Sequence, residues 1–242
     1  MSTRLDKHDK VALAASGGKD STACVWLLKD YLDRITIYHV DTGDELPEVR
    51  DAVAAIEAMA PHFVRVTTDV IGWIAAHGLP SDLVPHSAHQ FGQVMGEGQV
   101  RLAARYDCCH ANRAGALFAR IKADGNTMMI SGIRRDDMRV MSSHDGDVLD
   151  GIEVFYPVET WSTADVLAYL ANVGAPLPPF YPELAHGVDC AGCSAWWSEE
   201  RGAYLRRVHP ELYRQYQARL QLIVGEITRP LQQLARELEQ HE

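Results

Sequence analysis

The chain has 242 residues, of which 47% are hydrophobic and 23% charged, a composition that excludes a disordered chain and a fibrous repeat. It has neither the roughly 18 uninterrupted apolar residues of a membrane helix nor an apolar core in its opening MSTRLDKHDK, so we expect a cytoplasmic protein without membrane attachment. The formal net charge of -10 argues against broad, non-specific binding of nucleic acid, although it does not exclude local basic patches.

The first half of the chain predicts strands that alternate with helices. Residues 10–15 (KVALAA) read as a strand, SGGKDS as a tight loop, and residues 22–32 as a helix. A second β-branched and aromatic strand at 35–41 is followed by a helix near 48–60, with Pro47 in its first turn. The third strand, at 63–69, precedes a loop-rich stretch at 77–107 that could act as a mobile lid.

The second half continues the alternation and ends in helices. A helix over 108–123 leads to a fourth strand at 127–132. A helix over 161–174 has Ser162 or Thr163 as its cap and Gly174 as its stop. The tail at 211–240 predicts one long helix, or a helix broken at Pro230. The order predicts an α/β fold with a mainly parallel, twisted sheet, helices on both faces and a C-terminal helical extension.

The segment between the first strand and the first helix has the composition of a phosphate-binding loop. Two glycines allow a tight turn close to a polyanion, and the helix N-terminus adds free N–H groups and a positive dipole end. A glycine turn that merely starts a helix is the plainer alternative, which the complete motif makes unlikely. The motif consists of Ser16, Gly17, Gly18, Lys19, Asp20 and Ser21. It is similar to the loop of the PP-loop superfamily of ATP pyrophosphatases (adenine nucleotide alpha-hydrolase-like fold), which implies cleavage of ATP to AMP and pyrophosphate, usually with Mg²⁺.

Two further motifs resemble the phosphoadenylyl-sulfate (PAPS) and adenylyl-sulfate (APS) reductase family. The first runs from His39 through Asp41, Thr42 and Gly43 to Glu45, Pro47 and Glu48. Its Asp41 and Gly43, at the end of the second strand, could meet the ribose or base or hold a metal, or the segment could be a solvated capped turn. The second follows the fourth strand, and the pattern from Pro157 through Tyr169 to Tyr181 extends it. It contains Gly132, Arg134, Arg135 and Arg139.

The arginines of the second motif suit an oxyanion. A guanidinium binds sulfate or phosphate through two parallel donors, so we expect Arg134, Arg135 and Arg139 to contact substrate or leaving group. Alternatively, Arg134 and Arg135 pair with the neighbouring Asp136 and Asp137 on a solvated loop.

Five cysteines in a chain without an export signal point toward metal or redox use and away from a disulfide framework. Four of them form two pairs separated by 80 residues, as 190 - 109 - 1 = 80. This arrangement resembles the CC-x80-CxxC pattern of iron-sulfur APS reductases, which implies that a 4Fe-4S cluster is held by Cys108, Cys109, Cys190 and Cys193. A structural zinc and free or redox-paired thiols are the alternatives. Cys24 reads as a small buried hydrophobe.

Two departures from the reductases bear on function. The family's C-terminal nucleophilic cysteine is absent, because no cysteine follows Cys193, and the phosphate loop is intact where the reductases commonly have an eroded one. We therefore expect an ATP-cleaving enzyme that activates an acceptor for sulfur transfer, with Lys19, Asp41, Arg134 and Arg135 as catalytic residues.

Several alternatives and partners stay open. One alternative is an APS or PAPS reductase that uses an external thiol, and another is a non-catalytic nucleotide-binding subunit with a structural metal. The resemblance implies residues 1–193 as the nucleotide-binding domain and 194–242 as a helical extension. An adenine nucleotide is the expected ligand. The acceptor, nucleic acid included, the sulfur donor or reductant protein, and assembly into a homo-oligomer are left open.

Overall fold

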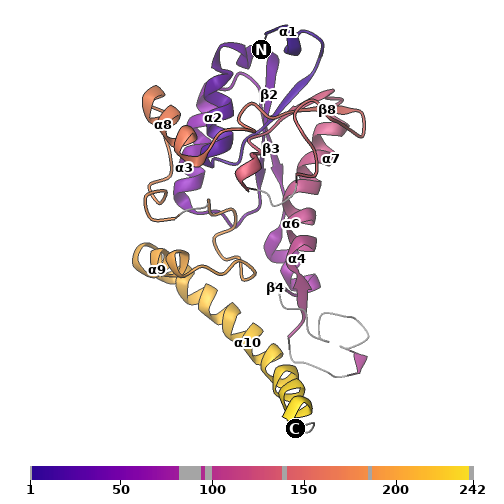
Figure 1. Cartoon of the computed structure of the whole chain (residues 1–242), viewed down its shortest axis with the longest axis vertical. Helices are drawn as coiled ribbons and strands as arrows, with labels where there is room; N and C mark the ends of the chain where they lie inside the picture. Colours follow the sequence, from indigo (N-terminus) through magenta and orange to yellow (C-terminus); the bar gives the residue numbers. More distant parts are fainter. Residues whose placement is uncertain (1, 82–93, 96–99, 138–140, 185–186, 240–242) are drawn as a thin grey trace. The chain divides into compact units, whose positions relative to one another are not determined.

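The structure is a computed structural model that describes residues 2–81, 94–95, 100–137, 141–184 and 187–239 (Figure 1). The chain divides into two compact units. Unit 1 comprises Met1–Asp41, Glu45–Thr68 and Arg113–Asp189, and unit 2 comprises Thr42–Asp44, Asp69–Asn112 and Cys190–Glu242. The phosphate loop therefore belongs to unit 1, whereas all four paired cysteines belong to unit 2, together with the C-terminal helices.

Unit 1 is built on a six-stranded sheet in the order β3-β2-β1-β6-β8-β7. Its strands are β1 (Val11–Ala14), β2 (Ile35–Asp41), β3 (Phe63–Thr67), β6 (Met128–Ile130), β7 (Val148–Leu149) and β8 (Ile152–Phe155). All neighbours are parallel except β7, which pairs antiparallel with β8. The strand order reverses at β1, so the loops that follow β1 and β6 flank the point where such sheets bind ligands. The predicted α/β class is confirmed.

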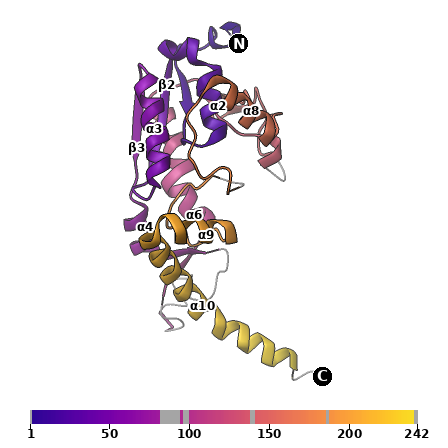
Figure 2. The ribbon, with the colours of Figure 1, turned by 90° about the vertical axis from the view of Figure 1, so that its left-hand side faces the viewer.

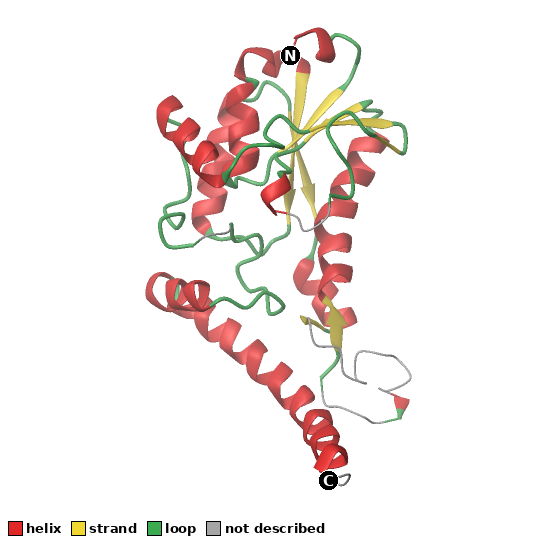
Figure 3. Cartoon of the chain, in the orientation of Figure 1, coloured by secondary structure: helices red, strands yellow, loops and turns green. Residues whose placement is uncertain are grey.

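Helices cover both faces of this sheet (Figure 3). On one face lie α2 (Lys19–Leu27), α3 (Pro47–Met59) and α8 (Thr163–Val173), whose apolar side chains join alternate residues of β1 and β2 in the main core. Figure 2 turns these helices toward the reader. On the other face, α7 (Gly115–Ala123) contributes Ile121 to a core with Ala12 and Tyr38. Burial on both faces explains the continuous apolar runs of the strands.

Local sequence signals set the helix ends in unit 1. Ser162 and Asp165 form a reciprocal capping box at the start of α8, and Gly174 ends it in the left-handed conformation, as predicted. Pro47 occupies the first turn of α3, where its missing N–H costs nothing. The first helix is shorter than expected, because the chain changes to a 3-10 helix over Lys29–Arg34.

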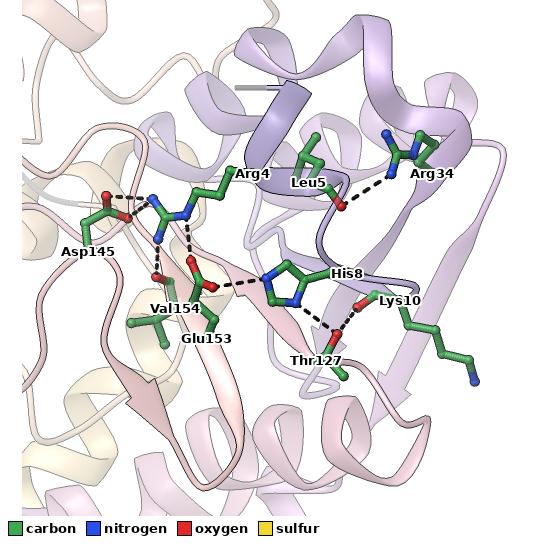
Figure 4. Close-up of polar contacts among 9 residues, drawn as sticks. All are labelled: Arg4, Leu5, His8, Lys10, Arg34, Thr127, Asp145, Glu153 and Val154. Atoms are coloured by element: carbon green, nitrogen blue, oxygen red, sulfur yellow. Dashed lines mark hydrogen bonds and ion pairs between the residues drawn. The ribbon is translucent and has the colours of Figure 1, made fainter.

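The N-terminal segment is fastened to the far strands of the sheet by charged groups (Figure 4). Arg4, in α1 (Ser2–Leu5), pairs with Glu153 at 2.7 Å and Asp145 at 2.8 Å, and its guanidinium lies 4.4 Å from the centroid of the Phe155 ring. His8 bridges Glu153 and Thr127, each at 3.0 Å. Burial disfavours the Glu153 carboxylate, but the bonds from Arg4 and His8 outweigh it and lower the pKa of Glu153.

Unit 2 consists of two short strands and several helices. β4 (Leu79–Ser81) and β5 (Leu102–Ala104) pair in parallel, preceded by α4 (Val70–His77) and followed by α6 (Arg105–Cys109). The C-terminal helices are α9 (Glu199–Val208) and α10 (Pro210–Glu239). Ile223 of α10 packs on Leu79 and Leu102 in a small core. No helix in the described part of the chain is long and apolar enough to cross a membrane.

The structure departs from the predicted elements in several places. The stretch 77–107 is not all loop, since it contains β4, β5 and the start of α6, although residues 82–93 and 96–99 lie outside the described ones. The predicted helix over 108–123 is divided into α6, a π-helical turn over His110–Ala114, and α7. Pro230 does not break α10; one missing N–H is tolerated inside a 30-residue helix.

Candidate nucleotide site and cysteine quartet

The phosphate loop joins β1 to α2 at the predicted place. Gly17 has φ +76°, and a Cβ there would lie 2.8 Å from Cγ2 of Val53, so both backbone conformation and space require glycine. Gly132, at the end of β6, approaches the start of α2 so closely that a Cβ would lie 2.7 Å from the backbone nitrogen of Ser21. The first and third predicted motifs therefore meet at the N-terminus of α2.

Two serines hold the turn of this loop from inside. The Ser21 hydroxyl accepts a hydrogen bond from the Ser16 backbone N–H at 3.1 Å and donates to the Gly18 carbonyl oxygen at 3.0 Å. The Ser16 hydroxyl accepts from the Gly18 N–H at 3.3 Å and lies 3.2 Å from that of Ser21. These bonds fix the turn of the loop ahead of the N-terminus of α2, with the Ser16 and Gly18 N–H groups bonded inside the loop.

The charged side chains of this site form a chain of alternating sign. Lys19, only 5% exposed, donates from Nζ to Asp20 at 2.7 Å. Asp20 lies 2.8 Å from Nε of Arg134, which is 1% exposed and also pairs with Asp137 at 2.7 Å. The pairing of Arg134 with Asp137, the alternative to an oxyanion contact, is present, but the Arg134 side chain is buried although the three residues after it are exposed. Two carboxylates therefore neutralise a buried guanidinium that holds the start of α2.

A tyrosine from a distant segment completes the loop. Tyr181 accepts a hydrogen bond from the backbone N–H of Lys19 at 2.8 Å. Burial raises the pKa of Tyr181 to about 12, so its hydroxyl stays protonated at neutral pH. The sequence pattern included this tyrosine without giving it a role.

The end of β2 is locked to the phosphate loop by a histidine. His39, 1% exposed, donates from Nδ1 to the carbonyl oxygen of Ala15 at 2.9 Å, and its Nε2 lies 3.0 Å from Glu45. Asp41 ends the strand in unit 1, while Thr42 and Gly43 belong to unit 2. This contact brings the second predicted motif to the same end of the sheet as the first.

Of the remaining arginines, Arg135 behaves differently from Arg134. Its side chain is 60% exposed and pairs with Glu159 at 3.1 Å, not with Asp136 or Asp137. Glu159 also bonds His144, and these contacts, the His144 bond first, lower the pKa of Glu159. Arg139 lies outside the described residues. Arg135 is thus the described arginine of this motif with an accessible guanidinium.

All four paired cysteines lie in unit 2. Cys108 and Cys109 end α6, immediately before the π-helical turn, a feature frequent at functional sites, whereas Cys190 and Cys193 lie in an irregular loop. No disulfide joins any of the five cysteines, all of which are described. Cys24 is fully buried in the main core of unit 1, and burial raises its pKa, consistent with its expected role as a small hydrophobe.

The quartet supplies four soft sulfur donors from one unit, the ligand type of thiolate-bound metals and iron-sulfur clusters. Burial, followed by the charges of Cys109 and Cys193, raises the pKa of Cys108 to about 11, so these thiols lie within electrostatic reach. The Asn112 amide lies 3.7 Å from Sγ of Cys108, the type of contact that supports ligand sulfurs. Within the described ranges, however, no three His, Cys, Asp or Glu side chains stand at metal-binding spacing.

A parallel sheet with a glycine-lysine loop between β1 and a helix N-terminus, and further motifs at neighbouring strand ends, defines an α/β protein of the PP-loop class. A family model for the phosphoadenosine phosphosulfate reductase domain matches residues 10–196. The chain therefore belongs to this family of sulfur-metabolism enzymes.

Relatives agree with this assignment. The chain is 23% identical over 199 residues to an adenosine 5'-phosphosulfate reductase of Allochromatium vinosum, a match that covers 77% of this chain and 68% of that protein. It is similar in fold to the crystal structure of a phosphoadenylyl-sulfate (PAPS) reductase from Candida auris, a phosphate complex, with a TM-score of 0.50 and 13% identity. That match covers 74% of this chain and 79% of the other.

Sequence reasoning included Tyr181, His39 and Glu45 in its motifs but gave these residues no role. In the structure, Tyr181 bonds Lys19 of the phosphate loop, His39 bonds Ala15 just before that loop, and Glu45 lies beside His39. Glu159, the partner of Arg135, was missed, because the two residues are 24 positions apart and no local signal marks the pair.

Proposed function

We propose that the chain is an ATP-cleaving sulfur-transfer enzyme. Unit 1 binds ATP and cleaves it to AMP and pyrophosphate, which activates an acceptor for replacement of oxygen by sulfur. The observation that carries this proposal is the intact phosphate loop, with Gly17 at φ +76°, directly ahead of the N-terminus of α2. A pyrophosphate group offers the oxygens that such a loop binds.

Some side chains of unit 1 stabilise charge in this proposal, and others position the nucleotide or the loop. Lys19 supplies the ammonium that meets negative charge developing on pyrophosphate, which lowers the barrier without a covalent intermediate. Asp41 at the end of β2 holds the nucleotide or its Mg²⁺. Arg135, with its exposed guanidinium, contacts an oxyanion, and buried Arg134 positions Asp20 and the helix start.

The quartet of unit 2 is proposed to hold a 4Fe-4S cluster through Cys108, Cys109, Cys190 and Cys193. When bound, the cluster supplies redox-active irons to the sulfur-transfer reaction. The chain's own contribution is four thiolates, an amide from Asn112 near Cys108, and a hydrogen-bonded loop around Cys190 and Cys193.

The second candidate is reduction of APS or PAPS, and the names of the relatives support it more directly than the first. An attacking thiolate would take the sulfo group by forming an S–S bond to the sulfate sulfur, while the S–O bond to the nucleotide breaks and AMP (from APS) or adenosine 3',5'-bisphosphate (from PAPS) leaves with the electron pair. Because no cysteine follows Cys193, that thiol would come from another molecule.

Product analysis separates the two candidates. Protein purified without air is incubated with ATP and Mg²⁺, or with APS and an excess of a small thiol, and pyrophosphate and sulfite are measured. Pyrophosphate from ATP, with no sulfite from APS, supports the first candidate. Sulfite from APS with no pyrophosphate establishes the second.

A further inference from the structure

The loop that carries Cys190 and Cys193 is fastened through its backbone carbonyls. Arg201 of α9 is 3% exposed, and its guanidinium lies 4.7 Å from the centroid of the Tyr216 ring. It donates, at 2.6 to 3.2 Å, to the carbonyl oxygens of Cys190, Ala191, Cys193 and Trp196. One buried cation therefore fixes this side of the loop to the C-terminal helices.

The amide side of the same loop is held by Asp44. The Asp44 carbonyl oxygen accepts from the backbone N–H of Ala191 at 2.8 Å, and its carboxylate Oδ2 accepts from the N–H of Gly192 at 3.2 Å. Arg219 donates to the Gly192 carbonyl oxygen and lies 3.8 Å from the Asp44 carboxylate. A Cβ at Gly192 would lie 3.2 Å from that carboxylate, so the packing is close.

These bonds connect two places where the chain passes between units. The chain leaves unit 1 after Asp41, the last residue of β2, and returns to it at Glu45. It leaves unit 1 again between Asp189 and Cys190. Asp44 is thus three residues from the strand end assigned to the nucleotide, and its polar groups bind the cysteine loop directly.

We propose that Asp44 is a positioning residue through which a nucleotide bound at the end of β2 stiffens the Cys190–Cys193 loop. A nucleotide that orders residues 41–45 also orders the Asp44 carbonyl and carboxylate, which reduces local opening of the Ala191 and Gly192 amides. The coupling is reciprocal, so a ligand that orders the cysteine loop tightens nucleotide binding by the same factor. This inference rests on the proposed nucleotide site of unit 1.

Hydrogen exchange of the Ala191 and Gly192 amides tests the coupling in the full chain as purified without air. In the parent protein, saturating ATP should slow exchange of both amides at least about threefold. Asp44→Ala should speed Gly192 exchange roughly tenfold, the effect of losing one charge-assisted hydrogen bond, and should abolish the response of Gly192 to ATP. The Ala191 amide bonds to the Asp44 backbone carbonyl, which the substitution keeps, so its response should remain. Asp44→Asn keeps an oxygen acceptor and should restore part of both Gly192 effects.

Controls separate coupling from damage to the fold. Asp51→Ala, an exposed carboxylate on α3, makes the same charge change and should leave exchange and the ATP response as in the parent. Calorimetry should find nucleotide affinity within about threefold of the parent for Asp44→Ala. If that variant unfolds by circular dichroism, Asp44→Asn decides: a weakened ATP response at retained affinity supports the proposal.

The outcomes that overturn the coupling are distinct from failure of the proposed function. Full protection of Gly192 by ATP in both Asp44 variants, or no protection in a parent protein that binds ATP, overturns it. Protection by APS in place of ATP supports the coupling and favours the reductase candidate. If calorimetry finds that the parent binds neither nucleotide, the proposed function fails and the coupling fails with it.

Discussion

The two units position their chemistry by different means. In unit 1 each functional segment follows a strand of one parallel sheet, so the register of β1, β2 and β6 brings the motifs together. In unit 2 the cysteines lie at a helix end and in a loop, where side chains such as Arg201 and Asp44 bind the backbone. Where a sheet positions a site, the order of strands and helices in the sequence predicts which residues meet. Where individual side chains position a site, the geometry depends on each of those side chains.

The largest expected effect concerns the quartet. Replacing any one of Cys108, Cys109, Cys190 or Cys193 by Ala should remove most of the bound iron, because loss of one thiolate opens an iron to solvent. The matched control is Cys24→Ala, a buried cysteine of unit 1. Iron and sulfide assays and the absorbance near about 400 nm measure this. Iron retained in a quartet variant and lost in the Cys24 variant would show that the ligands are assigned to the wrong unit.

The next effect is on nucleotide turnover. Lys19→Ala should slow the release of pyrophosphate from ATP by roughly 30- to 1000-fold. The reason is that a charge-assisted contact to an anion developing in the transition state contributes about 2–4 kcal/mol. Because Lys19 is buried against Asp20, its loss also exposes that carboxylate, so urea unfolding must be measured alongside. Lys122→Ala, an exposed lysine on α7, is the control. Unchanged turnover in a folded Lys19 variant would contradict the nucleotide site.

Arg134 and Arg135 should separate in stability and function. Arg134→Ala leaves Asp20 and Asp137 without their buried cation, which should cost about 2–4 kcal/mol of unfolding free energy. Arg135→Ala removes a 60% exposed partner of Glu159 and should cost less than about 1 kcal/mol. Urea denaturation measures both. If Arg135→Ala retains full activity, its proposed contact with an oxyanion is wrong.

The smallest effect is the acid sensitivity of the N-terminal anchor in unit 1. The folded-state pKa of Glu153 lies below its ordinary value, so the stability it adds is present above that ordinary value and is lost as the pH falls through the lowered pKa. Glu153→Gln should therefore reduce stability by up to about 1 kcal/mol at pH 7 and change little near pH 3. Thermal unfolding at both pH values measures this, and an equal loss of stability at both would exclude an ionic cause.

The sequence predicted most of unit 1 because its signals are local. The apolar runs of β1, β2 and β3, the SGGKDS loop and the capped helix at Ser162 each lie within a few consecutive residues. The hairpin of β7 and β8 was missed although its turn, Asp150-Gly151, has positive φ at both residues and is the dipeptide typical of two-residue hairpins.

Unit 2 was harder to predict for a physical reason. Its strands are three residues long, too short for a period to show, and α9 has a mainly charged sequence. The carbonyl partners of Arg201 lie 5 to 11 residues away from it, and Gly192, the partner of the Asp44 carboxylate, lies 148 residues away. The cysteine spacing alone could be read from the sequence, and it predicted the donor set without the groups that hold it.

Comparative calorimetry of ATP and APS on the parent protein tests the central claim most directly, that the phosphate loop of unit 1 is built for a pyrophosphate group. The claim predicts that ATP with Mg²⁺ binds more tightly than APS, because only ATP offers the phosphates that Ser16, Lys19 and the amides at the start of α2 can bind. Tight binding of APS with hardly any binding of ATP would contradict it and make the reductase candidate the function of this chain.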